Sequence, residues 1–340
     1  DAILTGKPHP VRAMYVSGVN IAVTYPDTHK VMAALKSLDF LVVASHMMTP
    51  TSEIADIVLP KTTGLEEEEV SLEPSAQIIC YTNPVKEPEN EARSDFDFTI
   101  DLARRLETRG IDTRTFFPWE TKQEFNEYLL GDEVDWVALK KNGWAPFDFK
   151  LGNFDAAGFK TPSGRIELWS ETLDGVGVDP LPGYEPPRID SADPATRKAY
   201  PLVLITGARE KTYHHSRYRD QAWARKVSPF PLLQVHPETA QELDVADSDW
   251  VSVETPGVDG KCKLKVTVTE ETGAGTVRTG MGWWLPEAAG PERGALEVNV
   301  NAALSYDGPW DPVTGSADTR GLPCRITPIP ESEIPMKEFA

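Results

Sequence analysis

The residues best suited to chemistry lie in one basic stretch, residues 209–226 (REKTYHHSRYRDQAWARK). It holds six Lys or Arg and two His against two acids, in a chain whose formal net charge is −19. The stretch begins just after an expected strand that ends in Thr206-Gly207, a place where backbone N–H groups are commonly left free. Free N–H groups, hydroxyls and guanidinium forks are what a phosphate or diphosphate needs. Two interpretations stay open: an anion-binding strand end, or a solvated basic surface that pairs with the acidic remainder.

Three other groups of residues could do chemistry, and each has a simpler explanation. The pair His214-His215 could bind a metal, but adjacent side chains of an extended segment point to opposite sides, so we expect no metal ligation. The acidic run Glu66–Glu69 could bind a hard cation, although such a run is more commonly a solvated loop. The pair Trp283-Trp284 could stack on a heterocycle or pack against a barrel, and composition does not decide between them.

A reactive centre is not visible in the sequence. It contains no G-x-S-x-G, no P-loop and no complete G-x-G-x-x-G. Cys80, Cys262 and Cys324 lie far apart and form no C-x-x-C pair, so we expect small apolar core residues. The residues alone therefore predict an anion-binding strand end and neither a catalytic nor a metal-ligating residue.

Bulk composition excludes several classes of protein. A length of 340 residues indicates two or three domains, and 40 % hydrophobic with 26 % charged residues is an ordinary globular composition. The net charge of −19 argues against broad nucleic-acid binding, and no apolar run is long enough for a membrane span. The chain opens on Asp1 without a signal pattern, so we expect it to begin inside a longer protein, with the compartment (periplasm or cytoplasm) open.

Apolar periodicity predicts a parallel α/β domain in the first third of the chain. Strands and helices alternate there, which favours a parallel, Rossmann-like sheet, too short to be a complete doubly wound domain. The expected strands are 12–17, 40–45, 57–60 and 76–81, and the expected helices are 31–38, 51–55 and 94–106.

The remainder of the chain divides into a loose connection and a β-rich domain. Residues 107–199 are rich in Pro, Gly and aromatics, with helices expected around 121–130 and 132–142 and a linker over 175–199. From residue 200 onward β patterns dominate, with a hairpin around PGVDG, a short helix at 236–243 and a turn at DPVTG, which predicts a closed barrel. The expected strands are 200–206, 249–255, 261–269, 276–286 and 322–329. The predicted domains are therefore 1–110, 111–199 and 200–330.

Several of these stretches together resemble the molybdopterin oxidoreductases of the dimethyl sulfoxide reductase type. The resemblance rests on colinear motifs whose variants TPT, GWWLP and DPVTGS look most like the branch with acetylene hydratases, hydroxytransferases and polysulfide or thiosulfate reductases. The motifs are FLVVASHMMTPTSEIADIVLPKTTGLEEEE (40–69), TPSGRIELWSETL (161–173), YPLVLITGAREKTYHHSRYR (200–219), QVHPETAQELDVADSDWVSVETPGVDGKCKLKVTVT (234–269) and VNVNAALSYDGPWDPVTGS (298–316). The resemblance implies that the partial α/β domain is followed by a double-psi β-barrel.

The resemblance also implies a cofactor, bis-molybdopterin guanine dinucleotide with molybdenum or tungsten. Its implied contacts are phosphate or guanosine at Gly18 and Asn20; the nucleotide pocket at Ser45 and Thr49; the pterin and diphosphate at Thr206, Gly207, Arg209, His215 and Ser216; and a pterin edge at Asn301. Three features depart from the family pattern. Ser45 stands where the family often has a guanine-reading aspartate, Ala208 intervenes before Arg209 where the family has Gly-Arg, and LEEEEVSLEPSAQ lacks the Gly…Asn-x-Glu-Gly-Arg pattern.

Read through this resemblance, the chain is the C-terminal half of an enzyme of oxygen-atom or electron transfer, or of acetylene-hydratase-like hydration. The metal ligand and an iron–sulfur cluster are then expected in an N-terminal half of the same polypeptide, and an iron–sulfur electron-transfer subunit is an expected partner. The 340 residues alone are expected to be inactive and to hold neither molybdenum nor iron. The alternative is a non-catalytic nucleotide- or protein-binding module made of an α/β domain and a β-barrel.

Overall fold

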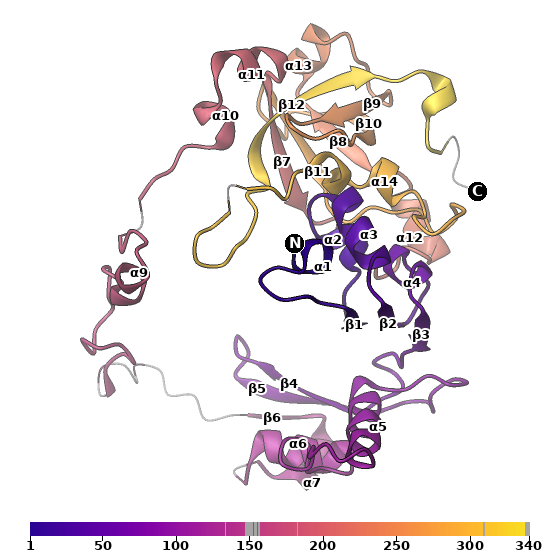
Figure 1. Cartoon of the computed structure of the whole chain (residues 1–340), viewed down its shortest axis with the longest axis vertical. Coiled ribbons are helices and arrows are strands. Elements are labelled where there is room, and N and C mark those ends of the chain that lie inside the picture. The colour runs from indigo at the N-terminus through magenta and orange to yellow at the C-terminus, as the bar shows by residue number, and fades with distance from the viewer. Residues whose placement is uncertain are drawn as a thin grey trace. The chain divides into compact units, whose positions relative to one another are not determined.

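The computed structural model describes residues 1–132, 134–146, 152, 155, 157–181, 183–308 and 310–336. Contacts divide the chain into two compact units (Figure 1). Unit 1 consists of Asp1–Val43, Met48–Ile57 and Trp169–Ala340, and unit 2 of Ala44–Met47 and Val58–Leu168. Among the described residues, no helix has the length and apolar character that a membrane crossing requires.

A small parallel sheet begins the chain, as predicted. Its strands β1 (Ala13–Ser17), β2 (Phe40–Ser45) and β3 (Ile57–Pro60) lie in the order β1-β2-β3. Four helices accompany it: α1 (Ala2–Thr5), α2 (Ile21–Thr24), α3 (Thr28–Lys36) and α4 (Pro50–Glu53). The Asp27 side chain caps α3 by accepting from the Lys30 N–H at 3.0 Å, and apolar residues at helical spacing turn Met32 and Leu35 into the core.

The second half of unit 1 is a closed barrel of six strands, which confirms the predicted barrel. The strands are β7 (Leu202–Ala208), β8 (Leu232–Val235), β9 (Trp250–Glu254), β10 (Cys262–Val268), β11 (Thr276–Gly280) and β12 (Arg320–Pro328), closed in the order β10-β8-β11-β7-β12-β9. Alternation along the strands fills the interior, and Cys262 and Cys324 are fully buried there, as apolar residues.

Two pairs of barrel strands run parallel, β7 with β11 and β8 with β10, and the other neighbours are antiparallel. The predicted hairpin joins β9 to β10, and Gly260 within it must be glycine because an added Cβ would overlap the Ala302 carbonyl oxygen. The remaining elements of unit 1 are α9 (Glu171–Gly175), α10 (Arg188–Ser191), α11 (Pro194–Ala199), α12 (Ala222–Val227), α13 (Pro237–Glu242), α14 (Ala295–Val298), η1 (Val300–Ala303) and η2 (Glu331–Glu333).

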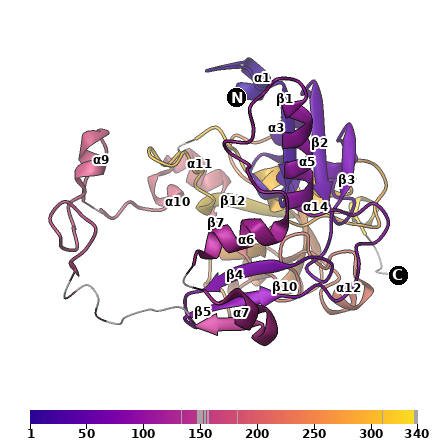
Figure 2. The same cartoon turned by 90° about the horizontal axis from the view of Figure 1, so that it is seen from below.

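Unit 2 contains a separate antiparallel sheet, β4 (Glu69–Glu73), β5 (Ile78–Thr82) and β6 (Trp144–Pro146), in that order. The strand expected at 76–81 therefore does not extend the parallel sheet, and that expectation is wrong. Helices α5 (Asp95–Glu107), α6 (Lys122–Leu130) and α7 (Trp136–Asn142) belong to the same unit (Figure 2). A capping box between Ser94 and Asp97 starts α5, as the sequence predicted.

The acidic run at the start of unit 2 is not the expected solvated loop. Glu66 is 8 % exposed and accepts hydrogen bonds from the Thr63 N–H at 2.7 Å and the Thr63 hydroxyl at 2.9 Å. These bonds lower the pKa of Glu66 to about 2. Glu68 accepts from the Tyr81 hydroxyl at 2.7 Å. The carboxylates therefore hold the local fold together, which the run of four acids could not reveal.

Candidate functional site

The strand end at Thr206-Gly207 carries two arginines. The Thr206 hydroxyl donates to the Thr319 carbonyl at 2.6 Å, which ties β7 to the start of β12. Gly207 has a φ of 81°, and a Cβ added there would lie 3.7 Å from Nη2 of Arg320. The guanidinium of Arg320 thus lies against Gly207, and Arg209 follows Gly207 two residues later in the chain. Arg320 was missed in the sequence because it is far along the chain; a lone cation after the DPVTGS turn was its only signal.

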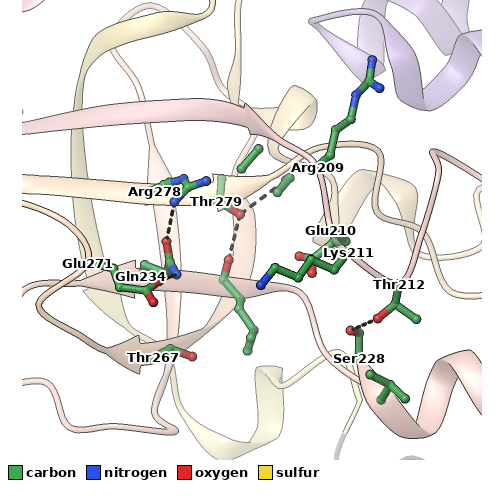
Figure 3. A pocket seen from close by; sticks show the side chains of 14 residues that line it. Arg209, Glu210, Lys211, Thr212, Ser228, Gln234, Thr267, Glu271, Arg278 and Thr279 are labelled. Carbon is green, nitrogen blue, oxygen red and sulfur yellow. Dashed lines mark hydrogen bonds between the residues drawn. The ribbon is translucent and has the colours of Figure 1, made fainter. Parts of the chain in front are cut away.

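A pocket of about 410 Å³ opens beside this strand end, on the outer face of the barrel (Figure 3). Lys211 points into it, whereas Arg209 points away from the other labelled side chains. Arg278 donates to the Gln234 carbonyl oxygen at 3.4 Å, and the Gln234 amide donates to a carboxylate of the same wall at 3.2 Å. The lining holds three cations and two carboxylates: Arg209, Lys211 and Arg278 with Glu210 and Glu271. Its charges are nearly balanced, so this pocket by itself does not select an anion.

The basic loop, defined here as residues 213–219, meets the α/β part of unit 1 through Ser216. The Asn20 amide donates to the Ser216 hydroxyl oxygen at 2.9 Å, and the Trp284 indole N–H donates to the same oxygen at 3.1 Å. Asn20 in turn accepts from the Thr51 hydroxyl at 2.6 Å. Two predicted site residues, 196 positions apart, are therefore in direct contact. Since both bonds use the Ser216 oxygen as an acceptor, its own O–H hydrogen remains available to a further acceptor.

The two histidines of the basic loop do not point to opposite sides. His215 has a φ of 54°, so the segment is left-handed there and not extended, and its ring contacts that of His214 edge to face with centroids 5.3 Å apart. Burial first, and then the positive charges of His214, Arg209 and Arg219, lower the pKa of His215. The lowered pKa favours the neutral form of the imidazole. Within the described residues no three His, Cys, Asp or Glu side chains are grouped so that they could hold a metal ion.

Both tryptophans after β11 are buried, which decides in favour of packing. Trp283 is 0 % and Trp284 1 % exposed. Trp283 stacks on the guanidinium of Arg219, whose centre lies 4.3 Å from the ring centroid, and Trp284 supplies the bond to Ser216. Neither ring is exposed as a platform for a heterocycle.

Asn301 is engaged inside unit 1. Its amide nitrogen donates to the Val23 carbonyl at 2.9 Å and to the Thr24 carbonyl at 3.1 Å, and the side chain is 7 % exposed. Asn299, which the sequence analysis did not single out, donates to the Val23 carbonyl at 3.0 Å. The two asparagines hold the last carbonyls of α2 against the barrel, which satisfies groups that every helix end leaves open.

The other predicted site residues lie at the ends of strands and helices. Gly18 follows β1 with a φ of 72° and open space around its Cα. Thr49 is 5 % exposed and caps α4, accepting from the Ser52 N–H at 3.2 Å. The Ser45 hydroxyl donates to the Met47 carbonyl at 2.8 Å, within unit 2. The hydroxyls of Ser45 and Thr49 therefore both have partners within the chain.

Two separate regions of the chain match known protein families, and the predicted site residues lie in these two regions. Residues 3–105 match the family described as "Molybdopterin oxidoreductase", and residues 202–323 match the "Molydopterin dinucleotide binding domain". Each match contains one partner of the contact between Asn20 and Ser216.

Known proteins similar to the chain are longer than it is. The acetylene hydratase of Syntrophotalea acetylenica is 33 % identical over 333 residues, covering 94 % of this chain and 44 % of the relative. The dopamine dehydroxylase of Eggerthella lenta is 25 % identical, covering 96 % of this chain and 39 % of the relative. The solved structure of acetylene hydratase from Pelobacter acetylenicus superposes with a TM-score of 0.86 at 31 % identity, covering 96 % of this chain and 45 % of that one. The chain thus spans less than half the length of these relatives.

Proposed function

Because residues 3–105 and 202–323 belong to the molybdopterin oxidoreductase and molybdopterin dinucleotide-binding families, we propose that the chain binds molybdopterin guanine dinucleotide as part of a molybdenum or tungsten enzyme. The contact between Asn20 and Ser216 carries the proposal. It brings one polar residue from each matched region to a single place, and the positive charge of Arg209 acts on His215, the residue next to Ser216. Hydroxyls, guanidinium groups and free backbone N–H groups are suited to a dinucleotide diphosphate.

The residues present fit such a group. Gly207 leaves the strand end without a side chain, the guanidinium of Arg320 lies against it, and Arg209 follows two residues later in the chain. Ser216 has an O–H hydrogen to donate, because Asn20 and Trp284 already occupy its oxygen. In this proposal Thr206, Gly207, Arg209, His215 and Ser216 hold the diphosphate and pterin, and Gly18, Asn20, Ser45 and Thr49 hold the nucleotide.

The finer description of the fold belongs to the same proposal. We take the closed barrel to be of the double-psi type, and the small parallel sheet to be part of a Rossmann-like domain. Residues 1–110 and 200–330 would then supply the cofactor contacts, while residues 111–199 connect them.

When bound, the cofactor supplies a metal centre for oxygen-atom or electron transfer, or for hydration of the kind that the name acetylene hydratase states. The chain's own groups bind and orient it: arginines neutralise phosphate charge, and the His215 imidazole and the Ser216 hydroxyl form hydrogen bonds to it. We further propose that the metal ligand and an iron–sulfur cluster lie outside these 340 residues, and that an iron–sulfur subunit is a partner. Metal analysis that found stoichiometric iron in the purified chain would contradict this assignment.

Calorimetric titration of the 340-residue chain with GDP tests the binding proposal. We expect measurable binding, and Ser216→Ala should weaken it about tenfold or more, because one hydrogen bond to a charged group is worth about 1.5 kcal/mol or more. The matched control is Ser37→Ala, which removes an exposed hydroxyl whose hydrogen bond goes to its own helix, at the Ala34 carbonyl. Absence of heat at millimolar GDP, or equal affinities of both variants, would refute the proposal.

A further inference from the structure

A single buried arginine, Arg219, is hydrogen-bonded to the backbone of the basic loop. Arg219 is 1 % exposed, and its guanidinium lies 4.4 Å from the ring centroid of Tyr213 and 4.3 Å from that of Trp283. Its Nε donates to the His215 carbonyl at 2.9 Å, and Nη2 reaches the Met281 carbonyl at 3.5 Å. One side chain therefore joins the loop to the segment that follows β11.

The charge of Arg219 lacks a counter-ion among the described residues. None of their carboxylates forms an ion pair with it, and Nη1 has no hydrogen-bond partner there. Glu210 acts on it only at longer range, and burial lowers the pKa of Arg219 to about 9, so the group is still protonated at neutral pH. Arg225 shows the contrast, because it is equally buried but is paired with Glu287.

A buried, unpaired cation is costly, and replacing such a group with an apolar one is often neutral or stabilising. The free energy of folding therefore does not explain why a charged residue occupies this position. A bound anion would explain it, since the charge of the anion would offset that of Arg219. Residues that break a local rule of stability tend to lie at functional sites.

We propose that Arg219 is a positioning residue for an anionic ligand: it holds the His215 backbone in the left-handed conformation that presents His215 and Ser216, and its charge is completed by the phosphates of the bound dinucleotide. The inference rests on the proposed function and adds a residue to it. The hydrogen bond from Arg219 to the His215 carbonyl fixes the backbone of the loop, and the rings of Tyr213 and Trp283 hold the guanidinium in place. Because the surroundings have a low dielectric constant, the electric field of this guanidinium is less screened than that of a surface arginine.

The experiment compares Arg219→Met with Arg325→Met. Methionine keeps an apolar, unbranched side chain of the length of the arginine stem but removes the guanidinium group and its charge. Arg325 is the matched control, because it also stacks on a ring, that of Tyr200 at 5.0 Å, yet it is half-exposed and paired with Glu254 at 2.6 Å. Both variants lower the net charge by one. The readouts are the melting temperature without ligand and the dissociation constants for GDP, inorganic pyrophosphate and guanosine.

We expect Arg219→Met to melt within about 2 °C of wild type or above it, and to bind GDP and pyrophosphate about tenfold more weakly, with guanosine unchanged. Arg325→Met should change none of the three constants by more than twofold. Unchanged pyrophosphate affinity in Arg219→Met, or a loss of melting temperature without a loss of affinity, would overturn the inference and make Arg219 a purely structural residue.

A second variant keeps the test decisive if Arg219→Met does not fold. Arg219→Lys retains the charge but loses the fork that reaches two carbonyls, so we expect pyrophosphate affinity about threefold weaker than wild type. Affinity equal to wild type in Arg219→Lys would overturn the positioning role. If wild type itself binds neither GDP nor pyrophosphate, the proposed function fails, which is a result distinct from failure of Arg219 alone.

Discussion

Asn301 is the residue for which the family resemblance and the structure suggest different roles, and one substitution separates them. The resemblance implies a contact with the pterin edge, whereas the amide nitrogen donates to the carbonyls of Val23 and Thr24 at 2.9 and 3.1 Å. Each such bond contributes about 1 kcal/mol net, and the Thr24 carbonyl would lose this donor, whereas the Val23 carbonyl would still accept from Asn299. Asn301→Ala should therefore lower the free energy of unfolding by about 2 kcal/mol or somewhat more, without any ligand.

Urea denaturation of the ligand-free chain measures this loss as a shift of the midpoint at unchanged slope. Asn301→Asp should be worse than Asn301→Ala, because it places a carboxylate against two carbonyl oxygens. The exposed Asn142→Ala is the control, with an expected change within about 0.5 kcal/mol. If the free energy of unfolding of Asn301→Ala is within about 0.5 kcal/mol of the wild-type value but the variant loses affinity for GDP, the Asn301 amide does not stabilise α2. That result would refute the role inferred from the structure.

Three further predictions follow from buried groups. Glu66→Gln should make the free energy of unfolding fall less steeply as the pH is lowered. The pKa of Glu66 in the folded chain, about 2, lies below the ordinary 4.5, so its stabilising contribution is complete above about pH 4.5 and is lost as the pH falls through 2. An equally steep fall in wild type and variant would contradict this. Gly260→Ala should destabilise the barrel by about 3 kcal/mol or more, measured by thermal melting, because its Cβ would overlap a carbonyl oxygen; an unchanged melting temperature would show that the hairpin can shift. A thiol reagent should label only Cys80 in the folded chain, since Cys262 and Cys324 are fully buried and burial raises the pKa of both thiols, that of Cys324 to about 12; rapid labelling of three thiols would argue against this core.

The regular elements were predictable where local patterns are strong. Continuous apolar runs gave β2 and β3 their observed bounds, and the Ser94 cap located the start of α5. Strand β5 was found as a strand but assigned to the wrong sheet. Hydrogen-bond partners are set by distant residues, and nothing in the run AQIICY states that β4 and β6 lie beside it.

The site was predictable as a set of positions but not as a set of contacts. The basic stretch, Thr206-Gly207 and Ser216 could be found from residue types and from family motifs. The left-handed backbone at His215 could not, because a non-glycine residue in that conformation has no reliable sequence signal. For the same reason the histidine pair was expected to diverge, whereas its rings are in contact.

The sequence by itself determined the family, the alternation that builds the parallel sheet, the β pattern of the barrel and the local reversal of charge at 209–226. These follow from short-range patterns and from motifs in a fixed order. Only the tertiary structure decided that Ser216 contacts Asn20 and Trp284, that Arg320 lies against Gly207, and that Arg219 is buried without a counter-ion among the described residues. The physical reason is common to all three. Burial and pairing depend on residues far away in the chain, so a surface cation and a buried one look the same in the sequence while differing widely in what they cost and what they can bind.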